Sequence, residues 1–343
     1  MSNSYFTYTE IISQPDAWAQ ALELASTVSL PAAVAYELVI FTGCGSTYYL
    51  SLAAAALYQE LTGRTARAVS GGELVLNPQT VLPIAINGVL PRALLVALSR
   101  SGTTTETVKA VEKFKNEQNG DVIVISNYGE ALSTFGDVNI IIPAGQEESI
   151  AQTRSFSSMY VAVMVLCAHM AGRTDLLRSM SALAETGQRL IRDFESAARR
   201  IGEDLTFDRF YFLGSGSRYG LACEISLKMK EMSLTHSEPF HFLEFRHGPK
   251  SMVNANTVVV GLLSDSNRSH EQAVLNEIEM LGGTVISLGE TDSTVSFQSD
   301  LPELACGVLH LPILQLIAYY RSLAKGLNPD RPNNLTSVVR LAL

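Results

Sequence analysis

Short apolar segments of strand length recur along the chain and alternate with helix-like segments. They lie at 37–43, 93–98, 121–126 and 138–143 in the first half and at 210–216, 257–263 and 284–289 in the second. Strands that are buried on both faces read as continuous apolar runs, so this alternation predicts an α/β protein whose parallel sheets are flanked by helices. The charged, helix-prone stretch 172–208 separates the two sets and predicts a domain boundary. We expect an N-terminal helical segment (1–30), a first domain (31–172), a helical linker (173–208) and a second domain (209–343).

The two halves resemble each other where a strand runs into a helix. The segment VIFTGCGSTYYLSLAA of the first half matches FYFLGSGSRYGLACEI of the second, with Gly-x-Gly-Ser before a helix in both. This match indicates a duplicated α/β unit. In each copy the free backbone N–H groups at the helix N-terminus could bind an anion. A dinucleotide-binding fold also begins in this way, but Tyr48 and Tyr219 replace the third glycine that its helix packing needs, which argues against that alternative.

Composition and charge narrow the class of protein. The 343 residues are 47% hydrophobic and 17% charged, enough for one large or two medium domains. The net charge of −9 and the lack of a basic run argue against nucleic-acid binding. The longest apolar run, 159–172, is too short for a membrane span and is predicted to be a buried helix. Four scattered cysteines predict neither disulfides nor a zinc site, so we expect a cytoplasmic protein without a metal or other cofactor.

Hydroxyl residues follow one of the predicted strands closely. Residues 99–105 contain five of them around Gly102, before an amphipathic helix. A capping box of Thr103 and Glu106 explains one hydroxyl and leaves the others unexplained. At the carboxyl end of a strand, hydroxyls and helix-terminal N–H groups form a neutral cradle for a phosphate monoester. Structural capping and phosphate binding both remain open from the pattern alone.

Charged residues share one face of the predicted helix 221–233. Glu224, Lys228 and Glu231 fall at i, i+4 and i+7 beside an apolar stripe. Such a face is typical of solvent-exposed ion pairs, and a catalytic set is the alternative.

The segment HFLEFRHGPK, residues 241–250, follows this helix. His236, His241 and His247 do not have the spacing of a zinc site. Gly248-Pro249 predicts a turn directly after His247, which leaves its imidazole at a chain reversal and available for acid–base chemistry. His241 is expected to be structural, the aromatic residues are expected to pack, and Glu244 is expected to line a cleft.

Together these motifs resemble the sugar isomerase (SIS) family of phosphosugar-binding proteins. The resemblance extends to the isomerase half of glutamine–fructose-6-phosphate amidotransferase and to free-standing deaminases or isomerases built of two SIS domains. It rests on GCGSTYY, SRSGTTTET, EESIAQTRSFSS, SLKMKEMSLTHSEPFHFLEFRHGPK and NPDRPNNLTSVV. It implies two tandem flavodoxin-like SIS domains and a homodimeric enzyme that acts on a hexose 6-phosphate.

The resemblance also implies roles for single residues. Glu231 would move a proton between C1 and C2 of the open-chain sugar, Lys228 would orient it, and His247 would assist ring opening from a neighbouring subunit. The substrate-binding residues would be Gly45, Ser46, Thr47, Ser99, Arg100, Ser101, Thr104 and Gln152. The implied reaction is aldose–ketose isomerisation of an amino- or keto-hexose 6-phosphate, coupled to loss of ammonia.

Several features depart from the family pattern. Arg100 stands where the synthases have glutamine, and no lysine follows Lys325 to form an imine with a ketose. A glutaminase domain is not expected, so glutamine would not supply ammonia. The second repeat has LLSDSNRSHEQ where a serine-rich loop would lie, so we expect one phosphate site per chain, in the first repeat. Two alternatives remain: a deglycase for 6-phosphofructosamines, and a phosphosugar sensor without catalysis, which would not need Glu231 and His247.

Overall fold

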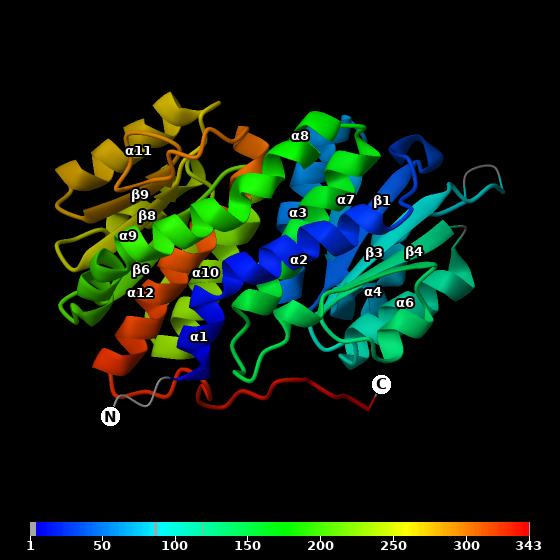
Figure 1. Ribbon diagram of the computed structural model, residues 1–343, viewed down its shortest axis with the longest axis horizontal. Helices are drawn as coiled ribbons and strands as arrows, with labels where there is room; N and C mark the ends of the chain where they lie inside the picture. The colour runs from blue at the N-terminus through cyan, green and yellow to red at the C-terminus, as the bar shows by residue number, and fades with distance from the viewer. Residues whose placement is uncertain (1–4, 86–87, 119, 343) are drawn as a thin grey trace. The chain divides into compact units, whose positions relative to one another are not determined.

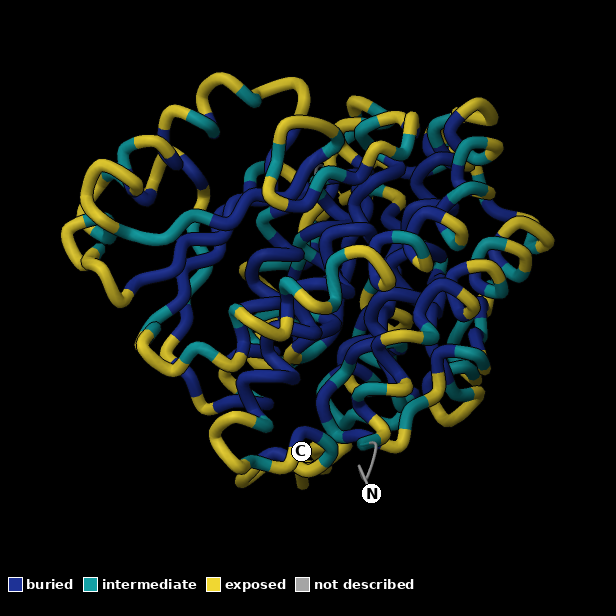
Figure 2. The backbone as a smooth tube through the Cα atoms, turned by 60° about the vertical axis from the view of Figure 1, so that its left-hand side comes forward, coloured by how far each residue is buried: buried dark blue, intermediate teal, exposed yellow. Residues whose placement is uncertain are grey.

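The computed structural model describes residues 5–85, 88–118 and 120–342, which form two compact units. The first-sheet unit contains residues 16–146, 154–181 and 336–342. The second-sheet unit contains residues 5–15, 147–153 and 182–335. In both units the central strands are buried, and the exposed positions lie mostly on loops, on outer helix faces and on edge strands (Figure 2).

The first-sheet unit is built on a parallel sheet of five described strands in the order β2-β1-β3-β4-β5. Helices α3 and α7 pack together against the sheet, and α4 packs with α6 (Figure 1). Ile40, Leu95 and Val124 of three strands share a core with Val111 and Phe114 of α6. The strands are β1 (Leu38–Gly43), β2 (Ala66–Ser70), β3 (Ala93–Ser99), β4 (Gly120–Ser126) and β5 (Val138–Ile141). The helices are α2 (Gln14–Thr27), α3 (Ser46–Thr62), α4 (Gly71–Leu76), α5 (Pro78–Val81), α6 (Thr105–Glu117), α7 (Arg154–Met170) and α8 (Thr174–Ser179).

The second-sheet unit repeats this strand order as β7-β6-β8-β9-β10, again with every described pair parallel. Helix α12 packs against α9 and α10, and α11 packs on β8 and β9 (Figure 1). The strands are β6 (Arg209–Leu213), β7 (His236–Phe240), β8 (Thr257–Leu262), β9 (Thr284–Gly289) and β10 (Val295–Ser296). The helices are α1 (Phe6–Ile12), α9 (Leu183–Glu203), α10 (Ser217–Ser233), α11 (Arg268–Met280) and α12 (Leu311–Ala324).

The predicted α/β fold class and the duplication are confirmed. Each of the seven predicted strands is present, although β5, β6 and β8 end before the predicted limits. The apolar run 159–172 lies mostly in α7, whose residues are almost all buried, as predicted. Of the helices that the structure describes, none combines the length and apolar character needed to cross a bilayer.

Candidate functional site

The turn between β1 and α3 forms one side of the candidate phosphate site. A Cβ on Gly43 would come within 2.6 Å of Thr47 Oγ1, and Gly45 has a φ of +58°, so the turn requires glycine at both positions. Ser46 and Thr47 begin the helix and are both buried. The Thr47 hydroxyl donates to the Cys44 carbonyl at 2.9 Å and accepts from the Cys44 N–H at 2.9 Å. The side chain of Thr47 thus holds the turn closed.

The loop after β3 forms the other side of this site. The Ser99 Oγ accepts from the Gly102 N–H at 3.1 Å, and Gly102 has a φ of +65° that suits glycine. The Ser101 Oγ accepts from the Thr103 N–H at 3.2 Å and lies 3.5 Å from the Thr104 Oγ1. The loop therefore curls on itself and gathers its hydroxyls at the start of α6.

Both segments lie at the same edge of the first sheet, because β1 and β3 are parallel neighbours. Cys44 Sγ lies 3.5 Å from Thr107 Oγ1 at the start of α6, which joins the two segments directly. Helix α6 begins at Thr105 with Thr104 as its N-cap. The capping box of Thr103 and Glu106 is therefore not the arrangement found, and the Thr103 hydroxyl donates to Ser101 Oγ at 3.2 Å instead.

Arg100 connects the loop to the C-terminal segment of the same unit. It is 7% exposed, and its Nη2 donates to the Ser337 carbonyl at 2.7 Å. The Leu341 N–H donates to Thr105 Oγ1 at 3.1 Å. Residues 337–341 thus run past the start of α6, held by side chains from the loop and from the helix.

Helix α10 places a buried lysine between two carboxylates in the second-sheet unit. Lys228 Nζ lies 3.3 Å from Glu224 Oε1 and contacts Glu231 Oε2. The side chains of Lys228 and Glu224 are 1% and 0% exposed, whereas that of Glu231 is 18% exposed. Burial alone lowers the pKa of Lys228, but the two carboxylates outweigh it and raise the pKa, so the ammonium is retained. The alternative of a solvent-exposed face is wrong for this helix.

The predicted turn at Gly248 is confirmed, and it follows a short 3₁₀ helix, η5 (Glu244–Arg246). Gly248 has a φ of +124°, and His247 just before it is exposed. Arg246 and Lys250 both pair with Glu277 of α11, at 2.6 and 3.2 Å. His247 therefore projects from a turn that is fixed on each side.

The aromatic residues before the turn pack as expected. Phe242 and Phe245 are buried in the second-sheet core. His241 stacks on Tyr219 with ring centroids 3.8 Å apart, and partial burial of the ring lowers the pKa of His241, although the residue as a whole is exposed. These contacts fit the structural role expected for His241. Glu244 is exposed, and its expected place in a cleft stays a prediction.

Gln152 lies in the loop 147–153, which belongs to the second-sheet unit. Its Oε1 is buried and accepts no hydrogen bond from the described residues. Glu10 of α1 holds this loop, because its Oε1 accepts from the Glu148 and Ser149 N–H groups at 2.7 and 3.2 Å. The Ile150 N–H donates to the Asp330 carbonyl at 2.9 Å.

A family model for the SIS domain matches residues 37–169 and 207–302, the two sheet-forming parts of the chain. The chain belongs to the SIS domain family. The two repeats expected from the Gly-x-Gly-Ser match are the two SIS repeats.

Curated relatives of this SIS protein carry the name glutamine–fructose-6-phosphate aminotransferase (isomerizing). The protein from Pyrococcus horikoshii is 28% identical over 98% of this chain and 57% of its own length. The one from Sulfolobus acidocaldarius is 34% identical over 72% of this chain and 42% of its own length. The chain thus spans about half the length of the curated relatives it matches.

Solved structures of two other proteins are similar to this chain over almost its whole length. Glucosamine-6-phosphate deaminase from Thermotoga maritima matches with a TM-score of 0.80 and 27% identity, over 98% of this chain and 100% of that one. Tagatose-6-phosphate ketose/aldose isomerase from Escherichia coli has the same fold, with a TM-score of 0.83 at 24% identity, over 97% of this chain and 96% of that one.

The structure assigns the expected site residues of this SIS chain to two groups. Gly45, Ser46, Thr47, Ser99, Arg100, Ser101 and Thr104 lie in the first-sheet unit, and Gln152, Lys228, Glu231 and His247 lie in the second-sheet unit. Sequence reasoning placed Glu224 on the charged face of α10 without giving it a separate role, and it missed Glu10. The i, i+4 spacing from Lys228 identified Glu224, whereas Glu10 is 138 positions from the Glu148 amide that it accepts from.

Proposed function

We propose that the chain is an aldose–ketose isomerase for a hexose 6-phosphate and releases ammonia when the substrate carries an amine at C2. The observation that carries this proposal is the buried Lys228 between Glu224 and the partly exposed Glu231. The Lys228 ammonium holds the carboxylate of Glu231 in one orientation, as a proton-transferring carboxylate requires. The family relationship and the 27% identity to a deaminase over the whole chain support the choice of substrate.

The proposed phosphate site is the hydroxyl cradle of the first repeat. Ser99, Ser101 and Thr104 lie where the N-terminus of α6 adds N–H groups and a favourable dipole for an anion. Arg100, in the same loop, would contact another part of the sugar. Holding the phosphate restricts the motion of the sugar, which lowers the entropy cost of reaction.

In the proposed reaction, the Glu231 carboxylate takes the proton from C2 of the open-chain aldose. The C–H electrons form the C1–C2 double bond of an enolamine or enediol, and the C1 carbonyl oxygen takes a proton. Glu231 then returns its proton to C1, and the heteroatom at C2 loses a proton to give an imine or a ketone. Water hydrolyses the imine to the ketose 6-phosphate and ammonia. His247, supplied by a neighbouring subunit, would open the sugar ring before these steps.

Incubation with glucosamine 6-phosphate in deuterated water tests this proposal. We expect deuterium at the exchanging carbon and free ammonia from the unmodified protein. Glu231→Gln should lower the exchange rate by about 10²- to 10⁴-fold, the usual contribution of a general base. Binding of the sugar phosphate, measured by calorimetry, should be retained.

The matched control is Glu238→Gln, which removes a carboxylate from β7 that pairs with the exposed His236. This variant should keep full exchange activity. Absence of both deuterium and ammonia, with fructose 6-phosphate and fructosamine phosphates also inert, would contradict an enzymatic function. Loss of binding in Glu231→Gln would instead make the role of this helix structural.

A further inference from the structure

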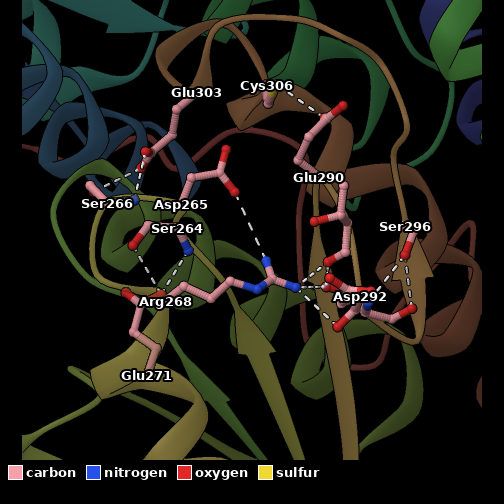
Figure 3. A network of polar contacts seen from close by, with 12 residues as sticks. Ser264, Asp265, Ser266, Arg268, Glu271, Glu290, Asp292, Ser296, Glu303 and Cys306 are labelled. Atoms are coloured by element: carbon pink, nitrogen blue, oxygen red, sulfur yellow. Dashed lines mark hydrogen bonds and ion pairs between the residues drawn. The ribbon is translucent and has the colours of Figure 1, made fainter.

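A second network of polar side chains lies at the carboxyl edge of the second sheet (Figure 3). It surrounds a small pocket of about 10 Å³ lined by Arg218, Asp265, Glu290, Glu303, Cys306 and His310. None of these residues has a part in the proposed reaction. The pocket is far too small for a sugar phosphate while the side chains keep these positions.

The sheet registers show which part of the first repeat this edge corresponds to. In the first sheet Ala97 pairs with Thr42, the residue before Gly43. In the second sheet Gly261 pairs with Leu213, the residue before Gly214. Ala97 and Gly261 are therefore equivalent positions. By the same alignment Leu263 is equivalent to Ser99, and Asp265 is equivalent to Ser101. Arg218 is the second residue of its helix, as Thr47 is of α3. The second repeat has thus lost the hydroxyl cradle and gained a cation.

Glu303 of the 3₁₀ helix η7 (Glu303–Ala305) fills the space between these two segments. Its Oε1 accepts from Arg218 Nη2 at 2.9 Å and from Ser266 Oγ at 3.2 Å. Its Oε2 accepts from the Ser266 N–H at 3.0 Å. The donors come from the start of α10 and from the loop after β8, the counterparts of the two segments that form the first-repeat cradle. Glu303 therefore occupies the position of a bound anion.

Buried polar atoms in the same pocket are not paired with the protein. His310 is fully buried and bonds to the Gly307 carbonyl through Nδ1 at 3.1 Å, while its Nε2 has no hydrogen-bond partner among the described residues. The Nε of Arg218, in a side chain that is 8% exposed, likewise has none within the described ranges. Buried polar groups are nearly always paired in folded proteins, so these atoms mark a ligand position.

We propose that this edge is the ligand site of the second SIS repeat and that the chain fills it with its own Glu303 carboxylate. The site takes a carboxylate monoanion, because Asp265 and Glu290 at its border repel a phosphate dianion more strongly, and Arg268, 3.9 Å from Asp265, offsets only one of these two charges. Glu290 is held in place by the Ser299 N–H and hydroxyl at 2.6 and 2.7 Å. Sugar phosphates are thereby confined to the first repeat. This inference does not depend on the proposed isomerisation.

Chemical rescue of Glu303→Ala tests the proposal. Removing the carboxylate leaves Arg218 without its partner, so the unfolding midpoint Tm should fall by roughly 5 °C in sodium chloride. Sodium formate at equal ionic strength should restore about half or more of the loss, because an anion that binds only the folded state raises Tm. In sodium phosphate, the difference in Tm between the variant and the unmodified protein should be the same as in sodium chloride.

Two further variants make the test specific. Glu203→Ala removes an exposed partner of Arg199 and should show no formate-dependent recovery. In the double variant Arg218→Met/Glu303→Ala, formate should no longer raise Tm. An equal Tm gap in all three salts would overturn the proposal, and closure of the gap by phosphate would overturn the choice of a carboxylate.

Refolding gives the same comparison if Glu303→Ala does not fold in chloride. The denatured Glu303→Ala variant is then diluted into sodium chloride, sodium formate or sodium phosphate, and the yield of native protein is measured. Recovery in formate alone supports the proposal. Equal recovery, or no recovery, in all three salts contradicts it.

Discussion

Lys228 is a buried cation whose charge is balanced by two carboxylates of its own helix. Lys228→Met should lower the free energy of unfolding by about 3–5 kcal/mol, because it leaves Glu224 buried with its charge no longer balanced. Urea unfolding near neutral pH measures this loss. The control Lys113→Met breaks a largely exposed i, i+4 pair with Glu117 and should cost less than about 1 kcal/mol. Equal costs for both variants would show that burial of Lys228 does not carry the effect.

His310 makes a prediction about pH. Burial lowers its pKa to about 3, and the nearby Arg218 acts in the same direction. In the unfolded chain a histidine takes up its proton near pH 6.5, so the unfolded state binds more protons between about pH 6.5 and 3. The stability that neutral His310 contributes is complete above this window and is lost as the pH falls through it.

The variant His310→Asn removes this titration and keeps an N–H donor for the Gly307 carbonyl. Between about pH 6 and 4, the pH slope of the unfolding free energy should fall by one proton, roughly 1.4 kcal/mol per pH unit. The exposed His270→Asn should leave the slope unchanged. An unchanged slope in His310→Asn would mean that His310 does not titrate in this way.

At the scale of the element, the turn before α3 depends on the backbone conformation of Gly45. Its φ of +58° with ψ of −124° is a region that side chains rarely enter. Gly45→Ala should therefore destabilise the fold by about 1–3 kcal/mol, although no atom lies within 4 Å of the added Cβ. Gly72→Ala in α4 also has open space, without a positive φ, and should be neutral or slightly stabilising. Denaturant unfolding of the two variants isolates the cost of backbone strain, because neither position is crowded.

The sequence predicted the central strands better than the edge strands. β1, β3, β6 and β8 are continuous apolar runs because helices cover both of their faces. Three edge strands escaped prediction: β2 reads ARAVS, β7 reads HSEPF with a proline, and β10 has two residues, whereas the edge strand β5 was predicted from the apolar residues of VNII. An edge strand is only partly buried and can include proline, so its sequence lacks the apolar run.

The candidate site was predictable only where its residues are close in sequence. The hydroxyl loop, the face of α10 and the turn after His247 are each local patterns. Burial of α10 depends on α12, β7 and β6, which pack on the helix and are not part of its own sequence pattern. Glu303 meets Arg218 across 85 positions, and no periodicity or turn signal reports such a pairing.

At the scale of the whole molecule, the two repeats carry different side chains at equivalent positions. Helices α3 and α10 both contain 17 residues, and each starts after a Gly-x-Gly turn of similar backbone conformation. Aligned from their first residues, Ala53 and Leu57 of α3 stand where α10 has Glu224 and Lys228. Only the first repeat has the hydroxyl cradle, and only the second has the lysine with its two carboxylates. This division agrees with the proposal of one phosphate site and one proton-transfer group per chain.

The proposed contribution of His247 from a neighbouring subunit can be tested by mixing two inactive variants. In a symmetric dimer of Glu231→Gln with His247→Gln, one site would carry both changes and the other neither. Random reassembly of equal amounts makes half of the dimers mixed, so activity should return to about a quarter of the unmodified level. If His247 acted within its own subunit, every site would keep one defect and activity would not return.

A second mixture controls for rescue by any other route. Glu231 and Lys228 lie on the same helix, so a mixed dimer of Glu231→Gln and Lys228→Met keeps one defect in each site. This mixture should stay inactive after the same reassembly procedure. Recovery in both mixtures would show that reassembly itself restores activity, whereas recovery in the first alone requires His247 to cross between subunits. We expect recovery in the first mixture alone, because His247 is exposed and lies on a turn fixed by Arg246 and Lys250.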